Sequence, residues 1–470
     1  MSEVVFPRSA DGRRSSAELG RAVVADALRP VDPAAADAAA REGGPADRSD
    51  GWRRGYLRHF RALVEAGLRS EHAAYEIASA GLASMRDRMR TADDRSLPEA
   101  LADDGGGPLE TVTVTGSGTP QREVALPYHR DLLRGAALHR QLDDWVRRGT
   151  IEESCAEAVR EVTANPDWLD LTDLRLVVLG AGAEMGPLPA VLGWGGTVLA
   201  VDLPRPDLWR RVHAVAEKSA GRLSGARADL LTDLPAVAQW ILRHEGRLVL
   251  GDYVYAPGAA YARLAAAVDS LGTYVRDRRP DTAIAKLATP TDVFAVPADA
   301  VAMATARYRQ RSGRARLANR LSGGRMLRPN YPAAADPGIC DSLVAQQGPN
   351  YALAKRIQRW RATAGRHDGV VSFSVAPPTR TRSVTSNRLL AAAYAGAHLF
   401  DVEVFEPATS STLMAVLLVH QLRRPRPPGR PAWTDEAFAA AHGGLWRAAY
   451  EPRSALPLAA VRGLPTAVRR

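Results

Sequence analysis

Cysteine is nearly absent from this sequence of 470 residues, and its absence excludes two kinds of protein. The two cysteines, Cys155 and Cys340, are too few for a disulfide framework or a structural zinc site. The ten histidines lack metal-ligand spacing, so we expect no metal site. Long apolar runs are also missing, and Leu413 to Val419 is far too short to span a bilayer. Because residues 1–30 carry charges every few positions, they lack the apolar core of a signal peptide. We therefore expect a cytoplasmic protein with no membrane partner.

Lysine is almost as rare, since the 62 basic residues include only Lys218, Lys286 and Lys355. Enrichment in Arg, Ala and Gly is typical of a GC-rich genome with few lysine codons, so each lysine that persists is a candidate for a role that needs lysine. The formal net charge of +10 is compatible with nucleic-acid binding. The arginines are spread along the chain, however, and are not interleaved with aromatic residues as in a base-stacking surface. We expect no nucleic-acid partner.

Composition and periodicity divide the chain into four predicted parts. The first has few large apolar residues, and the second combines helical periodicity with a β-hairpin of Thr111–Thr115 and Val124–Pro127. The third alternates strands with helices, and the fourth begins with a Pro- and Arg-rich stretch. The parts are 1–48, a flexible tail; 49–170, an N-terminal α+β extension; 171–422, a Rossmann-type catalytic domain; and 423–470, a linker and helical tail.

The third part predicts the fold class. Short apolar runs alternate with helix-length segments, which is typical of a doubly wound parallel α/β sheet of Rossmann type. Residues 305–345 interrupt this alternation with Arg, Gly and Pro, and we expect an insertion that covers the cofactor cleft. The predicted strands are Leu174–Leu179, Thr197–Val201, Gly225–Leu230, Arg247–Leu250, Thr282–Ala288 and Val370–Val375.

A glycine-rich turn follows the first of these strands. Gly180 suits a tight turn, Gly182 allows the backbone to approach a pyrophosphate, and Gly186 allows close helix–strand packing. Asp202 ends the second strand, where a carboxylate holds ribose hydroxyls. A carboxylate there favours NAD(H) over NADP(H), because it would repel a 2′-phosphate. The same pattern also fits an S-adenosylmethionine-dependent methyltransferase, so residues further along the chain must decide.

Those residues are Tyr351 and Lys355, which stand four apart in a predicted helix and therefore share a face. A neighbouring ammonium lowers the pKa of a phenol from its usual value of about 10. A tyrosine tuned in this way can exchange a proton with a carbonyl oxygen during hydride transfer. With 12 tyrosines and three lysines in the chain, the spacing is rarely met by chance. The pair favours an oxidoreductase over the methyltransferase.

The order of these motifs resembles the short-chain dehydrogenase/reductase superfamily. Leu179–Gly186 is similar to the family's Thr-Gly-x-x-x-Gly-x-Gly turn, although Glu184 stands where the middle glycine is usual. Ala228-Asp229-Leu230 resembles the segment that contacts adenine after the third strand. Tyr253–Gly258 and Val375–Thr379 resemble two further family motifs in altered form. The likeness covers residues 174–382 and implies that Asp229 and Leu230 bind the cofactor together with Gly180, Gly182, Gly186 and Asp202.

The resemblance also implies an active site. Lys286-Leu-Ala-Thr289 is similar to the end of the fifth strand, which places Thr289 where the family has its catalytic serine. Tyr351 would be the acid/base, and Lys355 its electrostatic partner and a ligand of the nicotinamide ribose. The spacing of 62 residues between Thr289 and Tyr351 is longer than usual, so an insertion must loop out. No clear equivalent of the family's helix asparagine exists, with Asp269 and Ser270 as the nearest polar candidates.

These observations predict an NAD(P)-dependent ketone or aldehyde reductase, or alcohol dehydrogenase, that acts on a small carbonyl or alcohol substrate. A homo-oligomer is compatible with the sequence. The methyltransferase and a non-catalytic nucleotide-binding protein stay open as alternatives, because several motifs are altered.

Overall fold

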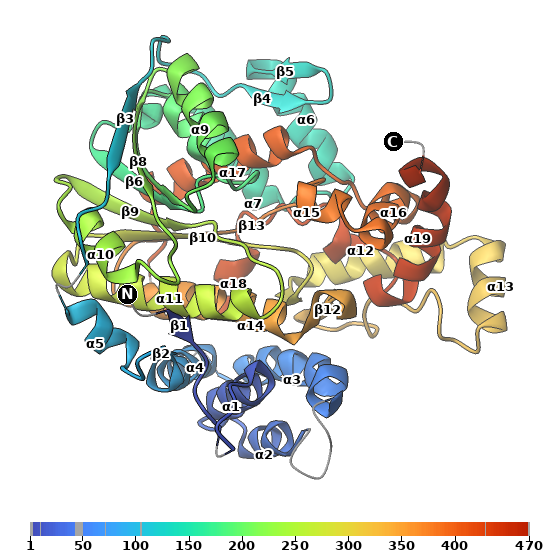
Figure 1. Ribbon diagram of the computed structural model, residues 1–470. Helices are drawn as coiled ribbons and strands as arrows, with labels where there is room; N and C mark the ends of the chain where they lie inside the picture. Colours follow the sequence, from blue (N-terminus) through green and yellow to red (C-terminus); the bar gives the residue numbers. More distant parts are fainter. Residues whose placement is uncertain are drawn as a thin grey trace.

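A seven-stranded sheet organises the computed structural model, which describes residues 3–9, 11–42, 50–70, 72–103, 106–427 and 429–468. The strand order is β13-β10-β9-β6-β7-β8-β3 (Figure 1). The strands are β3 (Thr111–Thr115), β6 (Leu174–Leu179), β7 (Thr197–Asp202), β8 (Arg222–Arg227), β9 (Arg247–Asp252), β10 (Ala283–Ala288) and β13 (Val371–Val375).

Six of these strands run parallel, and only β3 is antiparallel to its neighbour. Numbered along the chain from β6, the parallel strands follow the order 3-2-1-4-5-6, which is that of the dinucleotide-binding doubly wound fold. Their side chains are buried on both faces, which explains why the strands are nearly continuous apolar runs. The predicted α/β doubly wound parallel sheet is confirmed.

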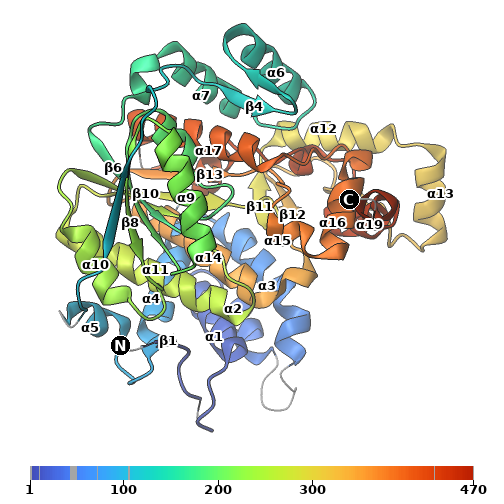
Figure 2. The ribbon, with the colours of Figure 1, turned by 45° about the horizontal axis from the view of Figure 1, so that its top comes forward.

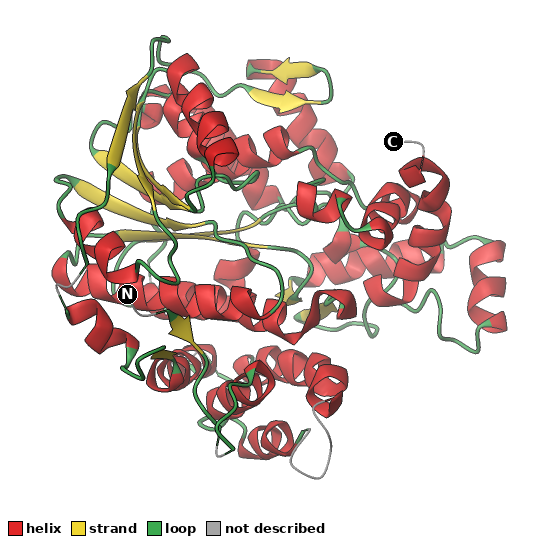
Figure 3. Cartoon of the chain, in the orientation of Figure 1, coloured by secondary structure: helices red, strands yellow, loops and turns green. Residues whose placement is uncertain are grey.

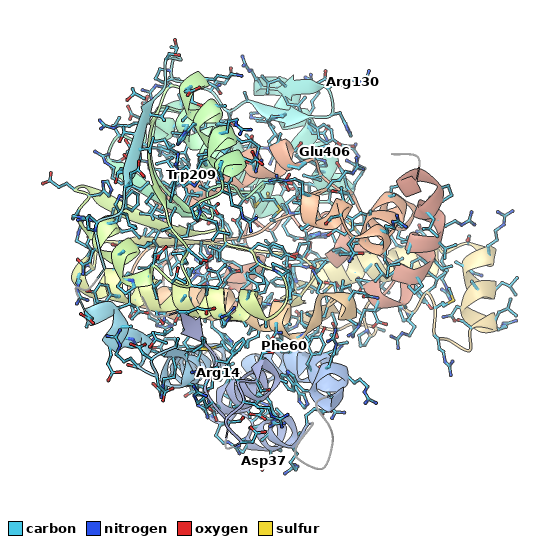
Figure 4. The ribbon with its side chains drawn as sticks, in the orientation of Figure 1. Arg14, Asp37, Phe60, Arg130, Trp209 and Glu406 are labelled. Carbon is cyan, nitrogen blue, oxygen red and sulfur yellow. The ribbon has the colours of Figure 1, made fainter. Side chains whose placement is uncertain are left out.

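Helices cover both faces of the sheet (Figure 3). One face packs against α10 (Leu234–Leu242), α11 (Ala259–Arg278) and α14 (Gly348–Gly365). The other packs against α8 (Leu188–Gly193), α9 (Pro206–Lys218) and α17 (Pro407–Arg423). Trp209 of α9 lies against the sheet (Figure 4), where a Cβ on Gly225 of β8 would be 2.4 Å from its ring. This close approach explains the glycine in an otherwise apolar strand.

The first 100 residues pack onto the body, so the flexible tail predicted for 1–48 is wrong for the described residues. In α1 (Ser16–Leu28), Leu19, Val23 and Val24 are buried in the same core as α14. Ser15 caps the helix by accepting the N–H of Glu18. The neighbouring elements are β1 (Val4–Val5), α2 (Pro33–Arg41), α3 (Asp50–Gly67), α4 (Ala73–Arg88), β2 (Arg90–Thr91) and α5 (Leu97–Ala102).

The predicted hairpin of Thr111–Thr115 with Val124–Pro127 does not form. Thr111–Thr115 is β3 and pairs with β8 at the edge of the main sheet. The second segment contributes to β4 (Leu126–Tyr128), which forms a small hairpin with β5 (Asp131–Leu133). Local turn signals predicted the nearer pairing, whereas the open edge of β8 offers β3 a longer ladder. Two helices follow, α6 (Gly135–Arg147) and α7 (Glu153–Ala164).

The insertion between β10 and α14 forms a projecting arm. It contains β11 (Val293–Val296), α12 (Ala298–Arg309), α13 (Gly313–Leu321) and β12 (Gly338–Asp341). Figures 1 and 2 show α13 standing out from the body. The base of the arm is tied to the C-terminal residues, since the phenol of Tyr331 donates to the carbonyl of Trp446 at 2.6 Å. The arm is therefore held against the C-terminal part of the chain, and its predicted position over the cofactor cleft stays a prediction.

The C-terminal part returns to the body through a buried ionic cluster, which we call the seam cluster. Glu152, before α7, accepts hydrogen bonds from His442 at 2.8 Å and from two nitrogens of the Arg447 guanidinium at 2.9 and 2.6 Å.

The remaining elements are η1 (Pro166–Leu169), η2 (Ala345–Gln347), α15 (Arg382–Thr385), α16 (Arg388–Gly396), η3 (Ala397–Phe400), α18 (Ala432–Ala437), η4 (Leu445–Arg447) and α19 (Pro452–Val468). Among the described residues, none of the helices is long and apolar enough to cross a membrane.

Candidate active site

The glycine turn joins β6 to α8 at the carboxyl edge of the sheet. Gly180 has φ +87°, and a Cβ there would lie 2.9 Å from the carbonyl oxygen of Tyr253. Glycine takes this conformation without strain. A Cβ at Gly182 would lie 2.8 Å from Leu208, whereas one at Gly186 would lie 3.3 Å from the nearest carbonyl oxygen. Helix α8 begins only at Leu188 and has six residues, so it contributes less to the turn than the sequence predicts.

Asp202 braces this turn. One carboxylate oxygen accepts the N–H of Gly182 at 2.7 Å, and the other accepts the N–H of Leu203 at 2.8 Å. Burial raises the pKa of Asp202, while the two backbone N–H groups and Arg205 oppose the rise. The carboxylate thus stands at the end of β7, where the sequence places a ribose ligand, and it also fixes the backbone expected to approach a pyrophosphate.

The two residues expected to contact adenine lie beyond β8 and differ in exposure. Asp229 is partly buried and accepts the N–H of Leu231 at 2.9 Å, closing the turn into α10. Leu230 is only 5% exposed and packs in the core beneath α10 and α11. The side chain of Leu230 therefore packs in the core, and its role in cofactor binding stays a prediction.

The three predicted catalytic residues come together at the carboxyl end of β10. Burial raises the pKa of the Tyr351 phenol above its usual value; the Lys355 ammonium and a hydrogen bond with Thr289 act in the opposite direction. Thr289 lies directly after β10, and its hydroxyl is 2.9 Å from that of Thr291. Because β11, α12, α13 and β12 loop out between them, residues 62 positions apart meet at one point. The expected fall of the tyrosine pKa is overturned, because burial outweighs the lysine.

Tyr261 of α11 completes this cluster and was not predicted. Its ring centroid lies 5.6 Å from that of Tyr351, and the Lys355 ammonium is 5.7 Å from the centre of the Tyr261 ring. Burial raises the pKa of Tyr261 well above its usual value. The polar candidate Asp269 on the same helix is instead bound by Arg361 at 2.6 and 3.1 Å. Asp269 therefore does not replace the asparagine that the resemblance implies.

Beneath Lys355 lies a buried polar chain, which we call the site cluster. The Lys355 ammonium donates to the amide oxygen of Gln358 at 3.1 Å, and the amide nitrogen of Gln358 donates to Asp252 at 3.2 Å. The same Asp252 oxygen accepts from Lys286 at 2.7 Å. Asp252 and Lys286 are register partners on adjacent strands, and both are buried. Two of the three lysines of the chain therefore lie in one cluster.

Two features of the sequence point to this cluster. Lys286 stood out as a rare lysine within an apolar strand, and Asp252 ends the preceding strand. Their pairing follows from strand order, which places β9 beside β10.

A second contact joins the glycine turn to the segment after β13. Glu184 accepts the backbone N–H of Arg382 at 2.8 Å and pairs with its guanidinium at 3.1 Å. The side chain of Arg382 is 61% exposed and that of Glu184 is 27% exposed, so this ion pair is weak. The segment that touches the turn is therefore α15 rather than the predicted insertion. Among the described residues, no group of three or more His, Cys, Asp or Glu side chains could hold a metal ion.

Comparison with known proteins adds structural neighbours but no sequence relatives. No family model and no curated protein matches the chain. Several of the similar solved structures are short-chain dehydrogenases/reductases. One, from Mycobacterium ulcerans, has 12% identity and a TM-score of 0.36, with 63% of this chain and 98% of that chain covered. An oxidoreductase of this family from Burkholderia thailandensis has 15% identity and a TM-score of 0.34, with coverages of 58% and 93%.

A third neighbour is a putative NAD(P)-dependent gluconate 5-dehydrogenase from Beutenbergia cavernae with bound NADP. It has 16% identity and a TM-score of 0.34, and the match covers 59% of this chain and 98% of that one. All three neighbours thus match over nearly their whole length but leave about two fifths of this chain without a counterpart. The fold assignment rests on the strand order and register described above.

Proposed function

We propose that this protein is an NAD(P)-dependent oxidoreductase that reduces a ketone or aldehyde. The observation that carries the proposal is the meeting of Thr289, Tyr351 and Lys355 at the carboxyl end of a sheet with dinucleotide-binding strand order. Ligands of doubly wound folds bind outside the carboxyl ends of the strands. The methyltransferase alternative leaves this cluster without a role.

The residues present fit a nicotinamide dinucleotide. Gly180 takes a backbone conformation that glycine favours, and the turn that follows brings Gly182 beside the Asp202 carboxylate. Asp202 would hold ribose hydroxyls at one end of the cleft, and Lys355 would hold those nearer the nicotinamide. The dinucleotide would supply the hydride that the protein side chains cannot. NAD(H) is the preferred form in this proposal, because a 2′-phosphate would meet the Asp202 carboxylate.

The raised pKa of Tyr351 gives the proposed reaction a direction. A phenol that stays protonated at neutral pH can donate its proton to a carbonyl oxygen. Thr289 would orient that oxygen with a second hydrogen bond, and Lys355 would stabilise the phenolate left behind. Alcohol oxidation needs the deprotonated phenol at the start, which burial disfavours. Reduction is therefore the favoured direction at neutral pH, and oxidation should gain as pH rises.

Calorimetric titration of the protein with NADH, NADPH and S-adenosylmethionine tests the proposal. We expect NADH to bind more tightly than NADPH, and we expect no binding of S-adenosylmethionine. The matched variant Asp202→Asn should narrow the difference between the two dinucleotides. Binding of S-adenosylmethionine alone would overturn the proposal in favour of the methyltransferase, and binding of NADH without turnover on any ketone or aldehyde would indicate a non-catalytic nucleotide-binding protein.

A further inference from the structure

One end of the molecule carries many more basic than acidic residues. It comprises α13, α16 and α19 with their flanking residues, and we call it the basic end (Figures 1 and 2). Residues 300–335, 380–400 and 452–470 contain fifteen arginines and no aspartate or glutamate, where average composition would give about eight acidic residues. The charge of the whole chain is therefore concentrated here more than a net value of +10 suggests.

Many arginines of the basic end lack ion pairs with described residues. Unpaired exposed arginines also occur elsewhere, for example Arg140, Arg211 and Arg243, but there they are not grouped with exposed apolar side chains. At the basic end, seven exposed arginines form no ion pair with any described residue: Arg309, Arg314, Arg316, Arg320, Arg325, Arg388 and Arg462. Their charge is available to an anionic partner.

The same surface exposes most of the large apolar side chains found outside the core. Eight such side chains are exposed among the described residues, and six of them belong to this end. Leu317 and Leu321 on α13 are 56% and 77% exposed, and their spacing places them on one face of the helix. The other four are Leu389, Leu399, Val461 and Leu464 on or beside α16 and α19.

Helix α13 itself indicates a missing partner. None of its nine residues is buried, and its exposed leucines lie between arginines. Short helices without tertiary packing are marginal in water, although Ser312 caps this one by accepting the N–H of Ala315. A basic amphipathic helix of this kind is stabilised when its apolar face leaves water and its cations meet anions.

We propose that the basic end binds the surface of a phospholipid bilayer that contains anionic headgroups, with Leu317 and Leu321 at the acyl boundary. Aliphatic side chains spread over three helices suit a broad, deformable apolar layer, and the unpaired arginines suit anionic headgroups. The observations favour lipid over nucleic acid, because Tyr308 and Phe400 both make edge-to-face contacts with Tyr450 and so do not form an open platform for bases. This peripheral contact needs no spanning helix and replaces the expectation of no membrane partner.

The proposed contact would bring the candidate site near the bilayer. The segment that leads into α16 contacts the glycine turn, where Glu184 accepts the backbone N–H of Arg382 at 2.8 Å. The basic end is therefore connected directly to the candidate site, which suits a substrate that partitions into lipid.

Sedimentation with vesicles tests the inference on the full-length protein. Vesicles of phosphatidylcholine alone are compared with vesicles that also contain phosphatidylglycerol, at low and at physiological salt. We expect binding only to the anionic vesicles. The variant Arg314→Glu, Arg316→Glu, Arg320→Glu should weaken it by on the order of 100-fold, since each cation near an anionic surface contributes about fivefold. The matched control Arg140→Glu, Arg211→Glu, Arg243→Glu changes exposed arginines elsewhere and should bind as the wild type does.

A second variant distinguishes binding to lipid from binding to other polyanions. Leu317→Ser with Leu321→Ser keeps every charge and should weaken vesicle binding several-fold, whereas Leu132→Ser, exposed on β5, should not. Circular dichroism of each variant checks that the fold is kept. Absence of binding to anionic vesicles would overturn the proposal. So would equal binding to a single-stranded oligonucleotide that the leucine changes leave unaffected, which would indicate nucleic acid instead.

Discussion

Two buried ionic clusters of this molecule use similar side chains in different ways. In the seam cluster, Glu152 is surrounded by His442 and Arg447, and Arg447 also pairs with Asp299. The site cluster runs from Lys286 through Asp252 and Gln358 and ends at Lys355, next to Tyr351. The first cluster joins distant parts of the chain and presents no free group. The second ends at the Lys355 ammonium, which lies 5.7 Å from the centre of the Tyr261 ring. The His–Glu pair therefore joins parts of the chain, whereas the proposed active site contains a lysine that has no carboxylate partner among the described residues.

Replacing the phenol at the end of the site cluster should have the largest effect on function. Tyr351→Phe removes only the hydroxyl, so the dinucleotide should still bind while turnover falls by about 10² to 10⁴. Lys355→Ala should lower both affinity and turnover, and the two changes should be far from additive because they disable one device. Turnover on an identified ketone or aldehyde, with dinucleotide affinity measured in parallel, checks this. Full activity of Tyr351→Phe would contradict the assignment.

Breaking the base of the site cluster should cost stability and function together. Lys286→Met leaves the Asp252 carboxylate buried without its cation, which should destabilise the fold by about 3–5 kcal/mol in urea denaturation. The altered charge beneath Lys355 should also shift the pH dependence of turnover. The double variant Lys286→Met, Asp252→Leu should recover much of the stability, because an apolar pair replaces an ionic one. If folded Lys286→Met had the same pH profile of turnover as the wild type, the pair of Lys286 and Asp252 would have no influence on the proposed reaction.

Breaking the seam cluster should cost stability alone. Burial by itself would raise the pKa of Glu152, but hydrogen bonds and charges from His442 and Arg447 outweigh it and lower the pKa to about 2. A depressed carboxyl pKa stabilises the folded state above the unfolded value of 4.5, and the contribution is lost as pH falls toward 2. Glu152→Gln should therefore lose roughly 3 kcal/mol at neutral pH and differ little from wild type near pH 2.

The control for the seam variant is its activity. The turnover per folded molecule should equal that of the wild type, because the cluster lies apart from Tyr351. If Glu152→Gln lowered turnover without lowering stability, the seam cluster would have a role in function, and the distinction from the site cluster would be wrong.

The smallest effect should come from the exposed contact between Glu184 and Arg382. Glu184→Gln removes a negative charge from the turn that would face a pyrophosphate and frees the Arg382 side chain. Because a largely exposed ion pair contributes at most about 1 kcal/mol, the affinity for NADH should rise no more than about fivefold. Titration with NADH measures this, and weaker binding would show that Glu184 supports the turn instead of competing with the ligand.

The sequence predicted the sheet well and its surroundings poorly. Strands such as Leu174–Leu179 are apolar on both faces, and this local pattern identifies a buried parallel strand. The partner of Thr111–Thr115 could not be predicted in the same way, because it lies more than 100 residues away on β8. The tail assigned to residues 1–48 failed because many small residues of α1 and α2 are buried by tertiary packing that composition does not reveal.

In the candidate site, too, local contacts were predicted and long-range contacts were missed. Spacing within one helix predicted that Tyr351 and Lys355 would be neighbours, and the resemblance supplied Thr289. The sign of the tyrosine pKa shift was missed because it depends mainly on burial of the phenol in the folded chain, with smaller electrostatic contributions from Tyr261 and Tyr394. Asp252 and Gln358 were missed because their contact with each other spans two elements far apart in sequence.

The antiparallel strand β3 has a consequence for the integrity of the molecule. It covers the edge of β8, where unpaired N–H and C=O groups would otherwise form a template for another chain. A shortened protein beginning at residue 171 would keep all six parallel strands but leave this edge bare. Such a fragment would be prone to edge-to-edge aggregation. The residues that precede the parallel sheet therefore protect it against self-association.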